Sequence, residues 1–204
     1  MFVQVIQGRT SQPEALAEAF DRWKADLSSG ATGWLGSTGG VTEDGRFIAV
    51  ARFESEEAAR ANSARPEQDA WWAETSQLLD GEATFRDSTD VEVDVQGDRD
   101  PDQAGFVQIM QGRGSDPERA KQLMAQDADK WAELRPDVIG SVAVGHEQGA
   151  YTMVMYFTSE AEARKGESQE LPPELQAQME EMNKLNIGEP EFFDLKRPVL
   201  SSPG

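Results

Sequence analysis

The sequence predicts an α+β protein made of two ferredoxin-like βαββαβ repeats that form an intramolecular pseudo-dimeric α+β barrel. Three observations lead to this prediction. The chain repeats itself at a fixed offset, both copies have the same order of strand and helix patterns, and each copy would leave one sheet face to be covered. We place the first repeat at residues 1–95, a linker at 96–104, the second repeat at 105–199 and a tail at 200–204.

The repeat can be followed letter by letter. The segment FVQVIQGR at Phe2 returns as FVQIMQGR at Phe106, and nine of the thirteen residues from position 2 to 14 are identical to those 104 positions later. The offset of 104 holds as far as Arg60 and Arg164 and then becomes 107, which a three-residue insertion in the second copy explains. A polar, turn-rich segment separates the copies.

The first half of each repeat predicts a strand, a helix and a hairpin. Residues 2–7 are rich in strand formers. Ser11 to Glu14 has the pattern of a capping box with proline in the first turn, so we expect a helix that runs to about Leu27. The Gly-rich segment 32–41 and the segment 46–53 should form the two strands of the hairpin.

The second half of the repeat predicts a broken helix and a last strand. We expect Ser55 to cap a helix that is interrupted at Pro66, resumes, and ends at Leu79 before Gly81. Residues 83–93 should form the last strand. The helices would then cover one face of each sheet, and the bare faces of the two copies would be buried together.

Composition excludes several classes of function. The net charge of −19 would repel nucleic acid and anionic membrane surfaces. The acidity could attract a cationic ligand, but the spread of the acids along the whole chain favours a role in solubility. Cysteine is absent and His146 is the single histidine, so we expect neither a metal site nor thiol chemistry. The sequence has no signal-peptide pattern and no long apolar run, so we expect a cytoplasmic protein. Its internal pseudo-twofold symmetry predicts a monomer.

From Phe2 to about Pro198 the order of elements and the tandem arrangement resemble the dimeric α/β-barrel superfamily, near the antibiotic-biosynthesis monooxygenase-like group. The resemblance implies a ligand pocket between the helices and the sheet of one repeat. It also implies one of several activities, among them cofactor-free formation of quinones and degradation of haem. Haem-degrading members use a histidine on the second helix, which residues 56–80 lack, so we expect no cofactor.

The two copies differ in a way that places this pocket in the first repeat. Six of the seven methionines lie in the second half, and four of the five tryptophans lie in the first. Methionine is a flexible filler of gaps, whereas aromatic walls with a few polar groups are typical of ligand pockets. The candidate ligand-binding residues are therefore Trp34, Arg52, Asn62, Arg65, Trp71 and Trp72.

Each of these candidates also has a purely structural interpretation. Trp71 and Trp72 point about 100° apart on a helix, so at least one of them could belong to the core. Arg52 shares a strand face with Ile48 and Val50 and could pair with a nearby acid. Asn62 could cap the helix segment near Pro66 instead of orienting a ligand.

Two functions remain open on the sequence alone. The first is a protein that binds a small aromatic ligand in the first repeat. The alternative is a cofactor-independent monooxygenase that acts on a planar aromatic or quinol substrate, with Arg52 stabilising a developing oxyanion. No nucleophile–base pair is visible, so catalytic residues stay unassigned.

Overall fold

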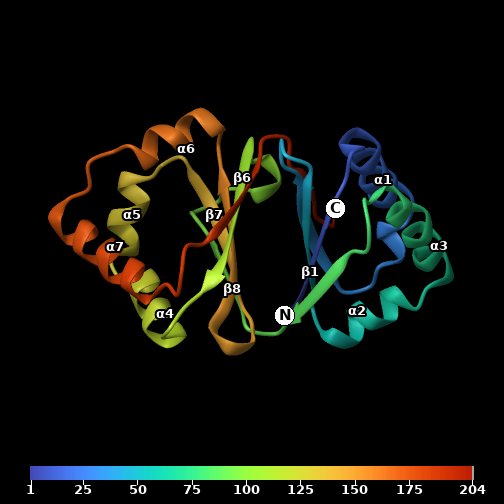
Figure 1. The fold of residues 1–204 in the computed structure, drawn as a ribbon, viewed down its shortest axis with the longest axis horizontal. Helices are drawn as coiled ribbons and strands as arrows, with labels where there is room; N and C mark the ends of the chain where they lie inside the picture. The colour runs from blue at the N-terminus through green and yellow to red at the C-terminus, as the bar shows by residue number, and fades with distance from the viewer. Residues whose placement is uncertain (204) are drawn as a thin grey trace. The chain divides into compact units, whose positions relative to one another are not determined.

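The structure, a computed structural model, describes residues 1–203 and divides into two compact units. The first unit comprises Met1–Val91 together with the residues from Phe193 onward, and the second comprises Glu92–Phe192. Each unit is organised around one five-stranded antiparallel sheet whose helices lie on one face (Figure 1). The predicted fold class, α+β with two ferredoxin-like repeats, is confirmed.

The first sheet has the strand order β10-β2-β3-β1-β4. The elements of the first repeat are β1 (Phe2–Arg9), α1 (Pro13–Asp26), β2 (Trp34–Val41), β3 (Arg46–Phe53), α2 (Glu56–Ser63), α3 (Pro66–Thr75) and β4 (Thr84–Ser88). A single 3-10 turn, Ser76–Leu78, follows α3. The break between α2 and α3 falls at the predicted place, because proline cannot supply the N–H that would continue the helix.

The second sheet has the strand order β5-β7-β8-β6-β9. Its strands and helices are β5 (Val91–Val95), β6 (Phe106–Arg113), α4 (Pro117–Ala125), α5 (Ala128–Leu134), β7 (Val138–Gly145), β8 (Ala150–Phe157), α6 (Glu160–Glu167), α7 (Pro173–Leu185) and β9 (Glu191–Leu195). The helix that is continuous in the first repeat is divided here at Asp127, whose φ of 53° is left-handed.

The strand registers repeat at the offset seen in the sequence. Phe2 pairs with Phe53 in the first sheet, and Phe106 pairs with Phe157 in the second. The register also shifts at equivalent places, between Trp34 and Gly36 in β2 and between residues 138 and 140 in β7. Both copies therefore fold on one backbone plan, bulge included.

The prediction of a single strand over residues 83–93 is wrong. The strand β4 stops at Ser88, whose hydroxyl accepts a hydrogen bond from the Asp90 N–H at 3.0 Å and so closes a turn. The following segment, β5, joins the second sheet beside β7. In the same way β9 is followed by β10 (Val199–Ser201), which joins the first sheet beside β2. Residues 200 and 201 of the expected tail thus belong to a strand.

The predicted capping box at Ser11 is also wrong. The N-cap of α1 is Gln12, and the Ser11 hydroxyl instead donates to the Asp80 carboxylate at 3.1 Å. In the second copy Asp116 caps α4 by accepting from the Arg119 N–H at 3.0 Å. The cap predicted for α2 is confirmed, because Ser55 accepts a hydrogen bond from the Ala58 N–H.

Both faces of the first sheet are buried. On the face without helices, Val3, Val5, Ile48 and Val50 are at most 2% exposed. On the helix side, one cluster of buried residues surrounds Trp23 and Trp34, and a second surrounds Leu16 and Phe47. The space between these two clusters is where the candidate site lies.

The turn between β2 and β3 can be tested at Gly45, with Gly188, which has nearly the same backbone conformation, as the control. Substitution of alanine for Gly45 (φ +79°) or for Gly188 (φ +78°) should lower the unfolding free energy of the protein by about 1–2 kcal/mol, because both residues have a left-handed backbone. A Cβ at Gly45 would also lie 2.9 Å from the Thr10 carbonyl oxygen, whereas none of the described residues comes within 4 Å at Gly188.

Gly45→Ala should therefore be clearly more destabilising than Gly188→Ala when both are followed by urea unfolding with circular dichroism. Equal losses for the two variants would contradict this account of the hairpin.

Candidate functional site

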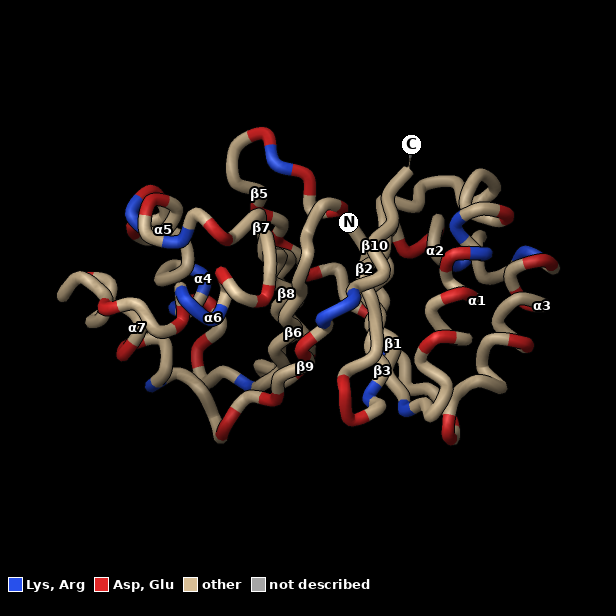
Figure 2. Tube along the Cα trace, turned by 90° about the horizontal axis from the view of Figure 1, so that it is seen from above, with Lys and Arg blue, Asp and Glu red and all other residues tan. Residues whose placement is uncertain are grey.

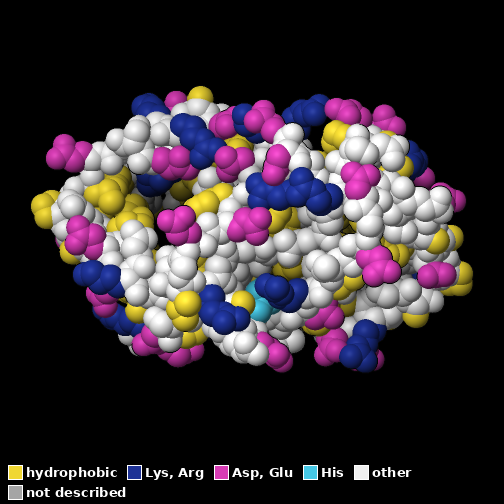
Figure 3. Space-filling view, in the orientation of Figure 1, with side chains coloured by type: hydrophobic (Ala, Val, Ile, Leu, Met, Phe, Trp, Pro, Cys, Tyr) yellow, Lys and Arg dark blue, Asp and Glu magenta, His cyan; other side chains and the backbone are white. Residues whose placement is uncertain are grey.

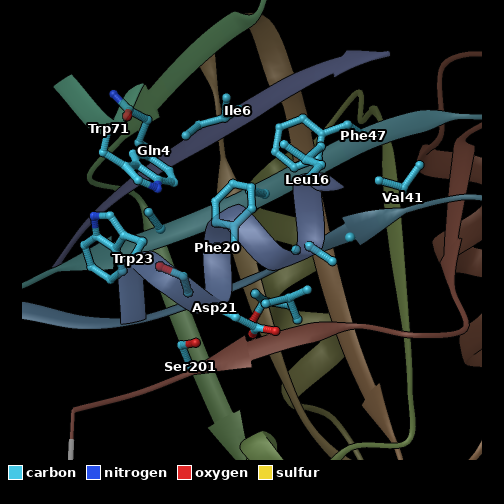
Figure 4. Close-up of a pocket in the computed structure, with 18 of the residues that line it drawn as sticks. Gln4, Ile6, Leu16, Phe20, Asp21, Trp23, Val41, Phe47, Trp71 and Ser201 are labelled. Carbon is cyan, nitrogen blue, oxygen red and sulfur yellow. The ribbon is translucent and has the colours of Figure 1, made fainter. Parts of the chain in front are cut away.

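A cavity of about 400 Å³ lies within the first unit, between the helix-covered face of the sheet and helices α1 and α3. Figure 4 shows the rings of Phe20, Trp23 and Trp71 gathered around this space, with Gln4 and Ile6 of β1 beside it. The volume is in the range of pockets that hold small-molecule ligands. All of the residues that line it belong to the first unit.

Small residues in the middle of β3 create the space. Because side chains alternate along a strand, Phe47, Ala49, Ala51 and Phe53 all face the helices. The two phenylalanines pack at either end, while the two alanines leave room between them. At the same positions, 104 residues later, the second copy has Tyr151, Met153, Met155 and Phe157. Methionines thus stand where the first unit has its cavity.

Six aromatic residues contribute to the cavity wall. Trp23 and Trp34 meet edge to face with ring centroids 5.0 Å apart, and Trp71 meets Phe20 in the same manner at 5.4 Å. Such contacts fix ring positions beyond what burial alone achieves.

The three indole N–H groups already have partners in the protein. They donate to Gln68 Oε1 at 2.6 Å, to Ser37 Oγ at 3.0 Å and to the Ala19 carbonyl at 3.0 Å. A ligand therefore meets the faces and edges of these rings, and finds no free indole donor among them.

Hydrogen-bonding capacity inside the cavity comes from amide and hydroxyl groups. Asn62 is 7% exposed, and its Oδ1 accepts from Arg65 Nη1 at 2.8 Å, while no described residue accepts from its Nδ2. Ser201 of β10 is 6% exposed and also lines the cavity. Gln4 also lines the cavity, and its Nε2 donates to Asp87 at 3.0 Å.

Ionisable side chains occur only at the rim of the cavity. Glu14, Glu18 and Asp21 follow one another along one side of α1, where Figure 2 shows the acidic positions, and all three are exposed. The single basic lining residue, Arg197, approaches Glu14 at 3.4 Å with its side chain 81% exposed. Elsewhere on the face drawn in Figure 3, acidic side chains are scattered among basic and neutral ones.

Three of the six predicted ligand-binding residues line the cavity: Trp34, Asn62 and Trp71. Trp72 does not line it and instead packs edge to face on Phe85 at 5.5 Å. This outcome follows from the angle of about 100° between adjacent helical side chains.

Arg52 does not line the cavity either, because it faces the opposite side of the sheet from Ala51 and Phe53. Its Nε is buried, and no described residue accepts a hydrogen bond from this atom. The prediction that Arg52 shares a face with Ile48 and Val50 is confirmed, but that face carries no helices.

Arg65 does not line the cavity, but its hydrogen bonds hold neighbouring parts of the cavity wall in place. Its guanidinium donates to the Leu27 carbonyl at 3.2 Å and to Asn62 Oδ1, and its Nε pairs with Glu67 at 3.0 Å. The pKa of the Glu67 carboxyl is lowered, first by its own backbone N–H at the start of α3 and then by Arg65. Arg65 therefore connects the end of α1 to the amide that faces the cavity.

Sequence reasoning missed Trp23, Gln4 and Ser201 as lining residues. The spacing of Leu16, Phe20 and Trp23 predicts a helix stripe against the sheet, and a stripe of this kind is ordinarily core. Ser201 lies in the segment expected to be a tail, and only its pairing with Ser37 of β2 brings it to the cavity.

Two further structural findings concern the described residues 1–203. They contain no group of three or more His, Cys, Asp or Glu side chains arranged to hold a metal ion. None of their helices combines the length and the apolar character that crossing a membrane requires.

Comparison with solved structures gives full-length likenesses. A candidate monooxygenase of Lactobacillus acidophilus matches with a TM-score of 0.73 and 10% identity, over 98% of this chain and 96% of that one. One from Fusobacterium nucleatum gives a TM-score of 0.74 at 11% identity, over 100% and 94%. An anthrone oxidase-like protein gives 0.66 at 11%, over 98% and 92%.

Neither the comparison with family models nor that with curated proteins gave a match. At 10–11% identity the structural likenesses establish the fold alone. That fold is the ferredoxin-like, two-repeat architecture of monooxygenase-like proteins, and it extends over the whole chain.

Removing the guanidinium of Arg65 should destabilise the protein. Arg65→Met leaves the Asn62 amide oxygen without its donor and removes the guanidinium from the Leu27 carbonyl, which keeps only the Gly30 N–H among the described donors. We therefore expect a loss of about 2 kcal/mol in unfolding free energy. The matched control is Arg60→Met, which removes an ion pair to Glu56 whose arginine is 79% exposed and should cost no more than about 0.5 kcal/mol.

Urea unfolding of the two arginine variants measures this difference. If Arg65→Met lowers the unfolding free energy no more than Arg60→Met does, the hydrogen bonds of Arg65 do not stabilise the cavity wall.

Proposed function

We propose that the cavity of the first unit binds a planar aromatic phenol or ketone, and that molecular oxygen oxidises this substrate there without a cofactor. The observation that carries the proposal is the wall of aromatic rings around a neutral interior, open because of Ala49 and Ala51. Flat rings can stack against Trp23, Trp34 and Trp71 or meet their edges. A charged substrate would find no opposite charge inside.

The proposed reaction converts a methylene group between aromatic rings into a carbonyl group. One molecule of oxygen is consumed: one oxygen atom becomes the carbonyl oxygen, and the other leaves as water with the two methylene hydrogens. The methylene carbon supplies all four electrons that reduce the oxygen. The substrate itself is thus the reductant, and no flavin or metal is needed for the electron balance.

Asn62 is assigned a role in the first step. Loss of a proton from the methylene carbon places negative charge on the conjugated substrate oxygen. The Nδ2 group of Asn62 can donate a hydrogen bond to that oxygen, because Arg65 holds the other end of the amide. Among the described lining residues only the rim carboxylates can accept the proton, so we assign it to Glu14, Glu18 or Asp21.

The structural likenesses favour oxidation over simple binding. Two of the full-length matches are candidate monooxygenases, and a third is an anthrone oxidase-like protein. Anthrone is a tricyclic ketone with a methylene group between two aromatic rings, which is the chemistry proposed above. It is therefore the first substrate to test.

Binding without turnover is the second candidate function. It is favoured by the position of the carboxylates, which are exposed at the rim and lie outside the neutral interior. A general base must come within hydrogen-bond reach of the proton it removes. A ligand that sits deep among the tryptophans could therefore be held and left unchanged.

Filling the cavity with the residue of the second copy tests the proposal. Ala51→Met places in β3 the side chain that β8 has at Met155, and it should obstruct the space between Phe47 and Phe53. With anthrone in air-saturated buffer, we expect kcat/KM to fall at least roughly tenfold, equal to about 1.4 kcal/mol of transition-state stabilisation. Oxygen uptake and anthraquinone absorbance measure the rate, after subtraction of the uncatalysed reaction.

The control variant is Met155→Ala, which makes the converse change in the second unit and should leave the rate unchanged. Circular dichroism verifies that each variant is folded. Tryptophan quenching by anthrone without oxygen uptake would favour the binding function. Wild-type protein that neither binds nor oxidises anthrone would contradict the proposal.

A further inference from the structure

The strand β10 contributes a hydroxyl group to the cavity. In β10, Ser201 pairs with Ser37 of β2 and Val199 pairs with Gly39, so both side chains face the helices. Leu200, between them, faces the other way. Ser201 is 6% exposed, and no hydrogen bond to its hydroxyl is found among the described residues.

The Ser201 hydroxyl is not among the fully buried polar atoms without a partner, so it keeps accessible surface, and the residue lines the cavity. A ligand there can supply the hydrogen bond that the protein does not. Asn62 has the same property on the α2 side of the cavity, where its Nδ2 has no acceptor in the described protein. Two separate elements thus bring polar groups without a protein partner into a space whose lining is largely apolar. This combination is typical of a site that recognises a polar group on an aromatic ligand.

The charge of that ligand follows from the surroundings. The interior lacks a basic side chain, and three carboxylates line the α1 rim against the single guanidinium of Arg197. A carboxylate or phosphate on the ligand would lose its water and gain no countercharge, and it would also be repelled on entry.

We infer that Ser201 contacts the ligand, and that the site selects an uncharged planar aromatic molecule whose oxygen is hydrogen-bonded by Ser201 and Asn62. This inference rests on the proposed function, since it describes the occupant of the same cavity. It adds that the site is incomplete without β10. The first repeat supplies the aromatic walls, and the C-terminal segment supplies one of the polar contacts.

Three tricyclic probes separate the contributions of shape, oxygen and charge. Anthracene has the rings without oxygen, anthrone adds a neutral oxygen, and anthracene-9-carboxylate adds a charged one. Their affinities for the full-length protein can be compared by tryptophan quenching under nitrogen, so that anthrone is not consumed. We expect the carboxylate to bind at least roughly tenfold more weakly than anthrone.

Ser201→Ala should weaken the binding of anthrone roughly three- to tenfold, the effect of one hydrogen bond, and should leave the affinity for anthracene unchanged. The matched control is Ser202→Ala, which makes the same chemical change one residue later, outside both β10 and the cavity lining. It should leave both affinities unchanged.

The inference is overturned if Ser201→Ala weakens anthrone and anthracene alike, because that would be a structural effect on β10. It is also overturned if neither affinity changes, or if the carboxylate binds as tightly as anthrone. In those cases anthrone binding that Ala51→Met abolishes would leave the proposed function standing. Absence of anthrone binding by the wild-type protein would instead remove the proposed function itself.

Discussion

The pleat of β3 is the constraint on which the site depends. It sends residues 47, 49, 51 and 53 to the same side of the sheet. There the phenylalanines at 47 and 53 keep α1 away from the two alanines between them. Close-packed interiors seldom leave such space, so it persists only because its walls are rigid. The edge-to-face rings and the bonded indole N–H groups provide that rigidity.

The fold was largely predictable, because its main signals are local. Periodicity and turn residues placed β3 and the break at Pro66, and the offset of 104 carried the same plan into the second copy. The predictions that failed concern contacts between segments that are remote in sequence. Nothing near Ser88 or Val199 indicates that the segments after them pair with β7 and β2, and nothing near Ser11 indicates that Asp80 would take its hydroxyl.

The presence of the cavity in the first unit was predictable, but only some of the residues that line it were. The contrast between tryptophan and methionine pointed to the first repeat, and the structure supplies the reason at Ala51 and Met155. Which side chains face inward depends on the side of a strand or the angle around a helix. Arg52 and Trp72 were each one position away from residues that line the cavity, and one position reverses a strand side chain.

The exchange of edge strands has a consequence for how the protein is made. Every element of the first repeat leaves the ribosome early and can begin to fold as it emerges. The strand beside β2, however, is β10 (Val199–Ser201), which follows the whole second repeat in the sequence. The second repeat must be synthesised before Ser201 can take its place, so a nascent chain shorter than residue 199 would carry the tryptophan walls of the cavity without the hydroxyl of β10.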